Sequence, residues 1–145
     1  MKTKNLLFTI VIFSLSSALA QDKELEYLYD FLQGQYQVVG RGPDSDRTYT
    51  GTVILRKENG QLKVIRKING EEIEGIGKIE TVTADEVRVL RVRFVQTGKK
   101  YEITYLIHSD FDNYARLSGY VYMQDGKTKR AGLEALFIDH RWDLS

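Results

Sequence analysis

The chain has no cysteine, one proline, two methionines and two histidines among its 145 residues. Without cysteine there is no disulfide, no cysteine nucleophile and no thiolate metal site. The two histidines, His108 and His140, do not stand in a metal-ligand spacing. Stability must therefore come from burial of apolar side chains, and we expect no metal or other cofactor.

Long runs of one charge are also missing. In total, 21 lysines and arginines are balanced by 20 acidic residues. A nearly neutral chain without a basic stripe is not expected to bind nucleic acid. The serines lack the strand-turn-helix setting of a hydrolase nucleophile. We therefore expect a protein that is not an enzyme.

The long apolar run lies at the start of the chain. Lys2 and Lys4 precede the apolar segment Leu6–Phe13, and Ala18-Leu19-Ala20 forms a small-x-small cleavage signal. This pattern predicts a cleaved signal peptide over residues 1–20 and an exported protein, periplasmic or extracellular. A retained membrane anchor is the alternative, although the run is short for a bilayer span. No integral membrane span is expected after cleavage.

Residues 21–34 are predicted to form a helix, because Asp22 can cap it and Gly34 can end it. Leu25, Leu28 and Leu32 share one face of this helix. From residue 35 onward the apolar period changes to two, which is typical of β-strands. Eight strand-like runs follow: Gln35–Gly40, Tyr49–Lys57, Gln61–Ile68, Glu72–Ile79, Glu86–Gln96, Lys100–His108, Tyr114–Gln124 and Lys129–Asp139.

The connections between these runs carry the residues of tight hairpins. Asn59-Gly60, Asn69-Gly70, Asp125-Gly126 and Gly98 all accept positive φ angles. Strands joined by hairpins pair antiparallel with their sequence neighbours, and closing the sheet removes its edges. We therefore predict an all-β fold, an eight-stranded antiparallel up-and-down β-barrel over residues 35–145. The alternative is a two-sheet β-sandwich.

Alternation along each run predicts which side chains face the interior. Leu90, Val92 and Phe94 alternate with arginines and should point inward. In another run Gly75 and Gly77 share the inner face. Paired glycines predict a sharp bend of the strand, with a cleared patch of cavity wall as the alternative.

The same alternation predicts an apolar patch outside the barrel. Tyr120 and Tyr122 should face outward, together with Leu136 and Ile138 of the last run. An exposed patch of this kind needs a cover. The leucine face of the helix is the expected cover, and a homodimer interface through Tyr120 and Tyr122 is the alternative.

Three short motifs stand at matching places along the predicted strands. Gly34-Gln35-Tyr36 opens the first strand, residues 109–114 (Ser-Asp-Phe-Asp-Asn-Tyr) join the sixth and seventh, and Arg141 follows the eighth. They resemble the Gly-x-Trp, Thr-Asp-Tyr-x-x-Tyr and arginine motifs of the lipocalins, within the calycin superfamily. The chain departs from the family pattern at Tyr36, Ser109 and Phe111. The resemblance implies a barrel that holds a small molecule.

One end of the barrel should be closed by these motif residues. Asp110 can fix its turn, Phe111 and Tyr114 can fold over the barrel end, and Arg141 is expected across the ring of Tyr36 as a cation–π contact. The predicted closure residues are Gly34, Tyr36, Asp110, Phe111, Tyr114 and Arg141.

The opposite end is then the site of binding. Arg66 follows Leu62 and Val64 on the inner face and could hold the acidic head of a ligand. Alternatively it reaches solvent at the rim or pairs with Glu72. The predicted ligand-binding residues are Tyr49, Arg66, Phe94, Tyr101, Tyr105 and Met123.

These observations predict an exported, lipocalin-like protein that binds a small apolar or amphipathic molecule inside the barrel. The alternative is a protein-interaction module, an inhibitor or an adhesin, whose barrel is filled by its own side chains.

Overall fold

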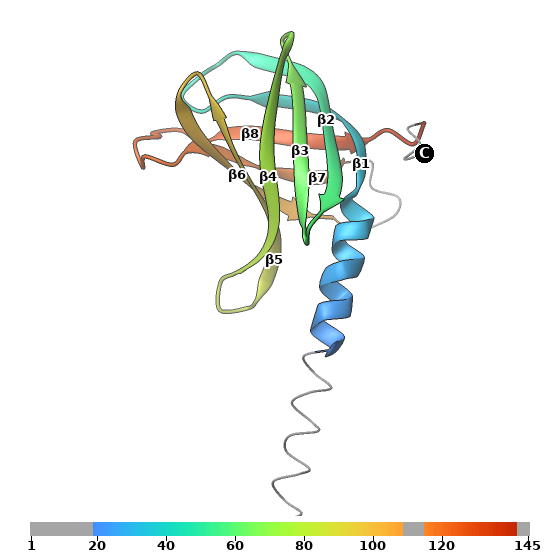
Figure 1. Ribbon diagram of the computed structural model, residues 1–145. Helices are drawn as coiled ribbons and strands as arrows, with labels where there is room; N and C mark the ends of the chain where they lie inside the picture. The colour runs from blue at the N-terminus through green and yellow to red at the C-terminus, as the bar shows by residue number, and fades with distance from the viewer. Residues whose placement is uncertain (1–18, 109–114, 142–145) are drawn as a thin grey trace, which may run out of the picture.

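Eight antiparallel strands close into a barrel in the computed structural model, which describes residues 19–108 and 115–141 (Figure 1). Each strand pairs with its sequence neighbours, and β1 pairs with β8. The predicted up-and-down barrel is confirmed, and the sandwich alternative is wrong. The strands are β1 (Gly34–Arg41), β2 (Thr48–Glu58), β3 (Gln61–Ile68), β4 (Glu71–Val82), β5 (Val87–Gln96), β6 (Lys99–Ile107), β7 (Ala115–Met123) and β8 (Gly132–Ile138).

Three connections are two-residue hairpin turns with positive φ at both positions, as predicted from the glycine at the second position of each turn. The β2–β3 and β3–β4 turns use Asn59-Gly60 and Asn69-Gly70. The β5–β6 turn uses Thr97-Gly98, with φ angles of 48° and 74°. A β-branched threonine is strained in this region, whereas asparagine tolerates it.

The β1–β2 and β7–β8 loops are joined to each other. Asp44 accepts hydrogen bonds from the backbone N–H groups of Lys129 and Arg130, at 3.1 and 2.7 Å. The Arg130 side chain also pairs with Asp46 at 2.7 Å. Because these N–H groups are bonded to Asp44, β8 begins at Gly132 and not at Lys129 as predicted.

The N-terminal helix, described over residues 19–32, lies at one end of the barrel and leads into β1 (Figure 1). Leu32 is fully buried in the core, and the Tyr29 hydroxyl accepts a hydrogen bond from the Ile79 backbone N–H at 3.1 Å. The helix therefore covers the barrel end, and the expectation that it covers the outer face of the last strands is wrong. Within the described part of the chain, no helix is long and apolar enough to cross a membrane.

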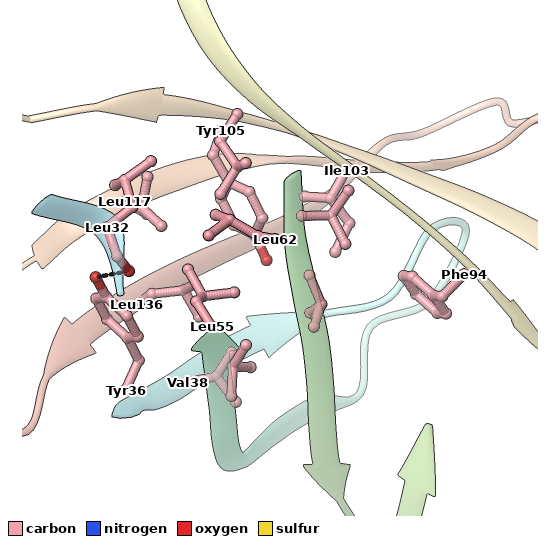
Figure 2. Close-up of a cluster of buried hydrophobic side chains, with 14 of the residues drawn as sticks. Leu32, Tyr36, Val38, Leu55, Leu62, Phe94, Ile103, Tyr105, Leu117 and Leu136 are labelled. Carbon is pink, nitrogen blue, oxygen red and sulfur yellow. Dashed lines mark hydrogen bonds between the residues drawn. The ribbon is translucent and has the colours of Figure 1, made fainter. Parts of the chain in front are cut away.

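The core fills the half of the barrel beside this helix. Figure 2 shows Leu32, Tyr36, Leu117 and Leu136 gathered together, with Phe94 set apart from them. A Cβ added at Gly77 would lie only 3.2–3.3 Å from side-chain atoms of Leu62, Val64 and Leu90. The glycine makes room for these side chains, so its inner face is core and not a cleared patch of cavity wall.

The outer apolar patch predicted on the last strand, β8, is wrong in its residues. Leu136 is fully buried and Ile138 is half-buried against the core, so neither faces outward as expected. The outward side chains of this strand are Leu133 and Phe137. Apolar residues stand at both parities of β8, so their period could not decide which set is buried.

The closed end uses a different arginine from the one expected. Arg141 is 88% exposed and pairs with nearby Asp139, so it does not lie over the buried Tyr36. The Tyr36 hydroxyl donates to the carbonyl oxygen of Leu32 at 2.8 Å (Figure 2). Arg116 instead stacks on the ring of Phe31 at 4.3 Å.

Burial raises the pKa of Tyr36 to about 12, while the charge of Arg116 and a hydrogen bond from it act in the opposite direction. Gly34 is buried beside Ile138 at the start of β1. The remaining predicted closure residues, Asp110, Phe111 and Tyr114, lie outside the described residues.

Candidate functional site

The end of the barrel opposite the helix contains a cavity of about 350 Å³, here called the mouth cavity. Its rim includes Pro43 and Asp44 of the β1–β2 loop and Lys99 at the start of β6. Five of the six predicted ligand-binding residues line it: Tyr49, Arg66, Phe94, Tyr101 and Met123. The sixth, Tyr105, is outside this lining and is fully buried deeper in the barrel.

A buried ion pair lies at the inner end of the mouth cavity. Arg66 of β3 and Glu134 of β8 are each only 3% exposed. The Arg66 guanidinium donates to both carboxylate oxygens, from Nη1 to Oε2 at 3.1 Å and from Nη2 to Oε1. Two parallel hydrogen bonds of this kind fix orientation as well as charge.

Two tyrosines complete this arrangement, which we call the buried cluster: Tyr49, Arg66, Tyr105 and Glu134. Tyr49 donates its hydroxyl proton to Glu134 Oε1, and Tyr105 donates to Oε2. The Tyr105 oxygen also accepts a bond from Arg66 Nη1 at 3.4 Å. Each carboxylate oxygen therefore accepts two hydrogen bonds, so the acceptor positions of the Glu134 carboxylate are all used.

Gly40 makes space for the buried cluster. It pairs with Tyr49 of β2 on one side and with Glu134 of β8 on the other. A Cβ at this position would lie 2.7 Å from Glu134 Cγ and 2.7 Å from ring atoms of Tyr49. The two side chains therefore meet across a residue that has no side chain of its own.

The protonation states in the buried cluster follow from burial and charge. Burial, together with the charge of Glu134, raises the pKa of Tyr49 and of Tyr105 well above the usual tyrosine value. Burial is the largest influence on the pKa of Arg66 and acts to lower it, but the interactions with Glu134, Tyr105 and Tyr49 together outweigh it, and the pKa is raised. At neutral pH Arg66 is therefore charged and both tyrosines keep their protons.

Aromatic rings form one wall of the mouth cavity. The Arg66 guanidinium carbon lies 4.8 Å from the centre of the Phe94 ring. Phe94 in turn stacks with Tyr101, at 5.3 Å between ring centres and 12° between planes. Phe94 is thus in contact with both Arg66 and Tyr101, and all three side chains line the cavity.

The structure corrects both alternatives that the sequence left for Arg66. The side chain does not reach solvent, and Glu72 pairs with Lys67 at 3.3 Å instead. Glu134 was missed because the parity of β8 was assigned wrongly. The available signal was a single carboxylate within the otherwise apolar strand Gly132–Ile138.

Arg66 Nε is buried without a hydrogen-bond partner among the described residues. Residues 19–108 and 115–141 contain no group of three or more histidine, cysteine or acidic side chains that could hold a metal ion.

Neither a scan of protein-family models nor a search of curated proteins finds a match for this chain. The architecture is nevertheless consistent with a lipocalin-like fold, because an eight-stranded antiparallel barrel is preceded by a short helix.

Proposed function

We propose that the chain is an exported, lipocalin-like protein that binds a small apolar or amphipathic molecule in the mouth cavity and catalyses no reaction. The observation that carries this proposal is the cavity itself, about 350 Å³ in a barrel whose other half is filled by core side chains. This volume falls within the range of about 300–1,000 Å³ that small-molecule sites occupy.

The lining supports binding by burial of apolar surface. Phe94, Tyr101 and Met123 offer large surfaces, and burial contributes about 25 cal/mol for each Å² of apolar area removed from water. The ionisable groups of the buried cluster are bonded to one another, and the tyrosines keep their protons at neutral pH. Such groups orient a ligand but are poorly suited to transfer protons.

Probe titration with two matched variants tests the proposal. Ile73 lines the mouth cavity, whereas Ile76 of the same strand faces outward and is exposed. A lipophilic fluorescent probe should bind the wild-type protein and Ile76→Trp equally. Ile73→Trp should abolish binding, because the larger indole protrudes into the cavity and obstructs it. Native mass spectrometry of protein from its own host should also show a bound small molecule.

The proposal fails if the wild-type protein binds no lipophilic probe and purifies without a small molecule. Equal binding by Ile73→Trp would place the site outside the mouth cavity.

A second candidate function, self-association, is favoured by an exposed surface on the barrel. We call it the outer apolar face: Val39, Leu106, Tyr120, Leu133 and Phe137, around a groove of about 570 Å³. Tyr122, which was expected here, is instead half-buried and its hydroxyl bonds to Glu102 at 2.8 Å.

The neighbouring outer surface is quite different, because Arg91 and Arg93 pair there with Glu80 and Glu102. A partner for the outer apolar face must itself present an uncharged apolar surface. A second copy of the chain offers one, and a two-fold axis would place the two faces against each other. We therefore propose a homodimer, in which Tyr120 is buried.

Analytical ultracentrifugation tests this assembly. The wild-type protein should sediment as a dimer, and Tyr120→Lys as a folded monomer. Ile76→Lys, on an exposed position away from this face, is the control and should remain dimeric. A monomeric wild type would overturn the homodimer and leave a different protein as the partner.

A further inference from the structure

We propose that the mouth cavity selects uncharged planar molecules, and that it discriminates against ligands carrying a net charge of either sign. This inference rests on the proposed function and names the class of ligand that the same cavity takes. It replaces the expectation that Arg66 holds an acidic head group.

The first argument is that the charge of Arg66 is already compensated. Glu134 receives two hydrogen bonds from the guanidinium, and both residues are excluded from solvent. A ligand carboxylate beside Arg66 would also approach Glu134, which has the same sign. Arg66 is therefore not a free anion site, despite its position in the cavity lining.

The second argument concerns the whole charged lining. Besides Arg66, the charged side chains on the cavity surface are Asp44 and Lys99 at the rim. With Glu134, these groups amount to two positive and two negative charges. Among the described residues, the charges around the mouth cavity therefore cancel and give no net attraction to an anionic or a cationic ligand.

The third argument is the energetic consequence of burial. Moving a charge from water into a protein interior without a compensating partner costs several kcal/mol. An uncharged ligand of the same shape avoids this penalty and retains the benefit of apolar burial. Among ligands that fit the cavity, charge should therefore separate those that bind from those that do not.

The aromatic lining favours a planar ligand. Phe94 and Tyr101 are stacked on each other and both line the mouth cavity, with Arg66 against Phe94. A flat aromatic ligand can pack edge-to-face or offset against such rings.

Three probes with one ring system test the inference by isothermal titration calorimetry at neutral pH. They are 2-naphthamide, 2-naphthoate and 2-naphthylmethylammonium, which are neutral, anionic and cationic. The wild-type protein should bind the amide at least about tenfold more tightly than either ion, a difference of about 1.4 kcal/mol. Ile73→Trp should remove this binding.

Glu134→Gln supplies the matched charge test, because it keeps the shape of the side chain and leaves Arg66 uncompensated. The variant should bind the anionic probe at least about tenfold more tightly than the wild type does. Glu102→Gln is the control, because it makes the same change in net charge on the outer surface. It should leave all three affinities unchanged.

The outcomes separate the two proposals. If the protein binds neither the naphthyl compounds nor other lipophilic probes, the proposed function fails. If 2-naphthoate or the ammonium binds the wild type as tightly as the amide, the inference is overturned while the carrier function stands. Circular dichroism establishes whether Glu134→Gln folds. If it does not, the comparison of the three probes on the wild type decides the inference alone.

Discussion

Arg66 of β3 and Glu134 of β8 stand 68 residues apart in the chain and form a two-point ion pair inside the barrel. Such a pair is poor evidence of stabilisation, because desolvating both charges offsets their attraction. Its energetic importance appears when one partner is removed. The other charge is then buried and uncompensated.

Removal of one partner should therefore destabilise the protein strongly. Glu134→Leu is expected to lower the free energy of unfolding by ~3–5 kcal/mol, measured by urea denaturation. The double variant Arg66→Met/Glu134→Leu should recover most of this loss, because no unpaired charge remains. If the changes in the free energy of unfolding of the two single variants simply add in the double variant, the two residues are not a coupled pair.

Gly40→Ala should disturb the same cluster by sterics alone. The new methyl group would meet Glu134 and the ring of Tyr49, so we expect a loss of ~1–3 kcal/mol in the free energy of unfolding. Gly42→Ala is the matched control, since a Cβ there would lie 3.8 Å from its nearest neighbour, Ser45. Similar stability of the two variants would show that Gly40 is not needed for space.

The interior tyrosines predict a loss of stability at high pH. The folded pKa values of Tyr36, Tyr49 and Tyr105 lie above the ordinary value of 10.0, chiefly because of burial. Their contribution to the free energy of unfolding is therefore complete below pH 10.0 and is lost as the pH rises toward the pKa values of the folded state. The free energy of unfolding, measured by urea denaturation in alkaline buffers, should fall above pH 10.0.

Tyr105→Phe should make this fall less steep, because the unfolded variant has one fewer tyrosine to ionise. Tyrosinate absorbance should increase in two stages, the second coinciding with unfolding. A single stage complete before unfolding would contradict the burial of these hydroxyls.

The β5–β6 turn offers a stabilising substitution. Thr97→Asn should raise the free energy of unfolding by ~1 kcal/mol, because asparagine adopts the positive φ of this position with less strain. The converse change, Asn69→Thr, should lower it by a similar amount. Differential scanning calorimetry of both variants checks the prediction, which is contradicted if their transition temperatures move in the same direction.

Local patterns in the chain were sufficient to predict the barrel. Alternating runs and the Asn-Gly pairs determine where strands begin, turn and pair, and all eight strands were placed within a few residues of their observed bounds. The lining of the mouth cavity followed from the same alternation. Phe94 shares its parity with Leu90 and Val92, which alternate with Arg91 and Arg93, and Tyr101 shares its parity with Ile103 and Tyr105.

Long-range relationships could not be predicted in the same way. In β8, Leu136 and Phe137 are equally apolar, so hydrophobicity did not show that Leu136 is buried. Glu134 has its partner in Arg66, five strands away in chain order, and a local pattern does not reveal a pairing over this distance. The predicted contact of Arg141 with Tyr36 was wrong because Arg141 pairs instead with Asp139, two residues away.

The helix-covered end would also limit how the proposed ligand is exchanged. Leu32 and Tyr29 obstruct that end, which leaves the passage beside Pro43 and Asp44 for both uptake and release. If the proposed binding function is right, a partner that takes the ligand from this chain would have to meet it at the rim. The helix lies at the opposite end of the barrel and would remain accessible to other contacts during that exchange.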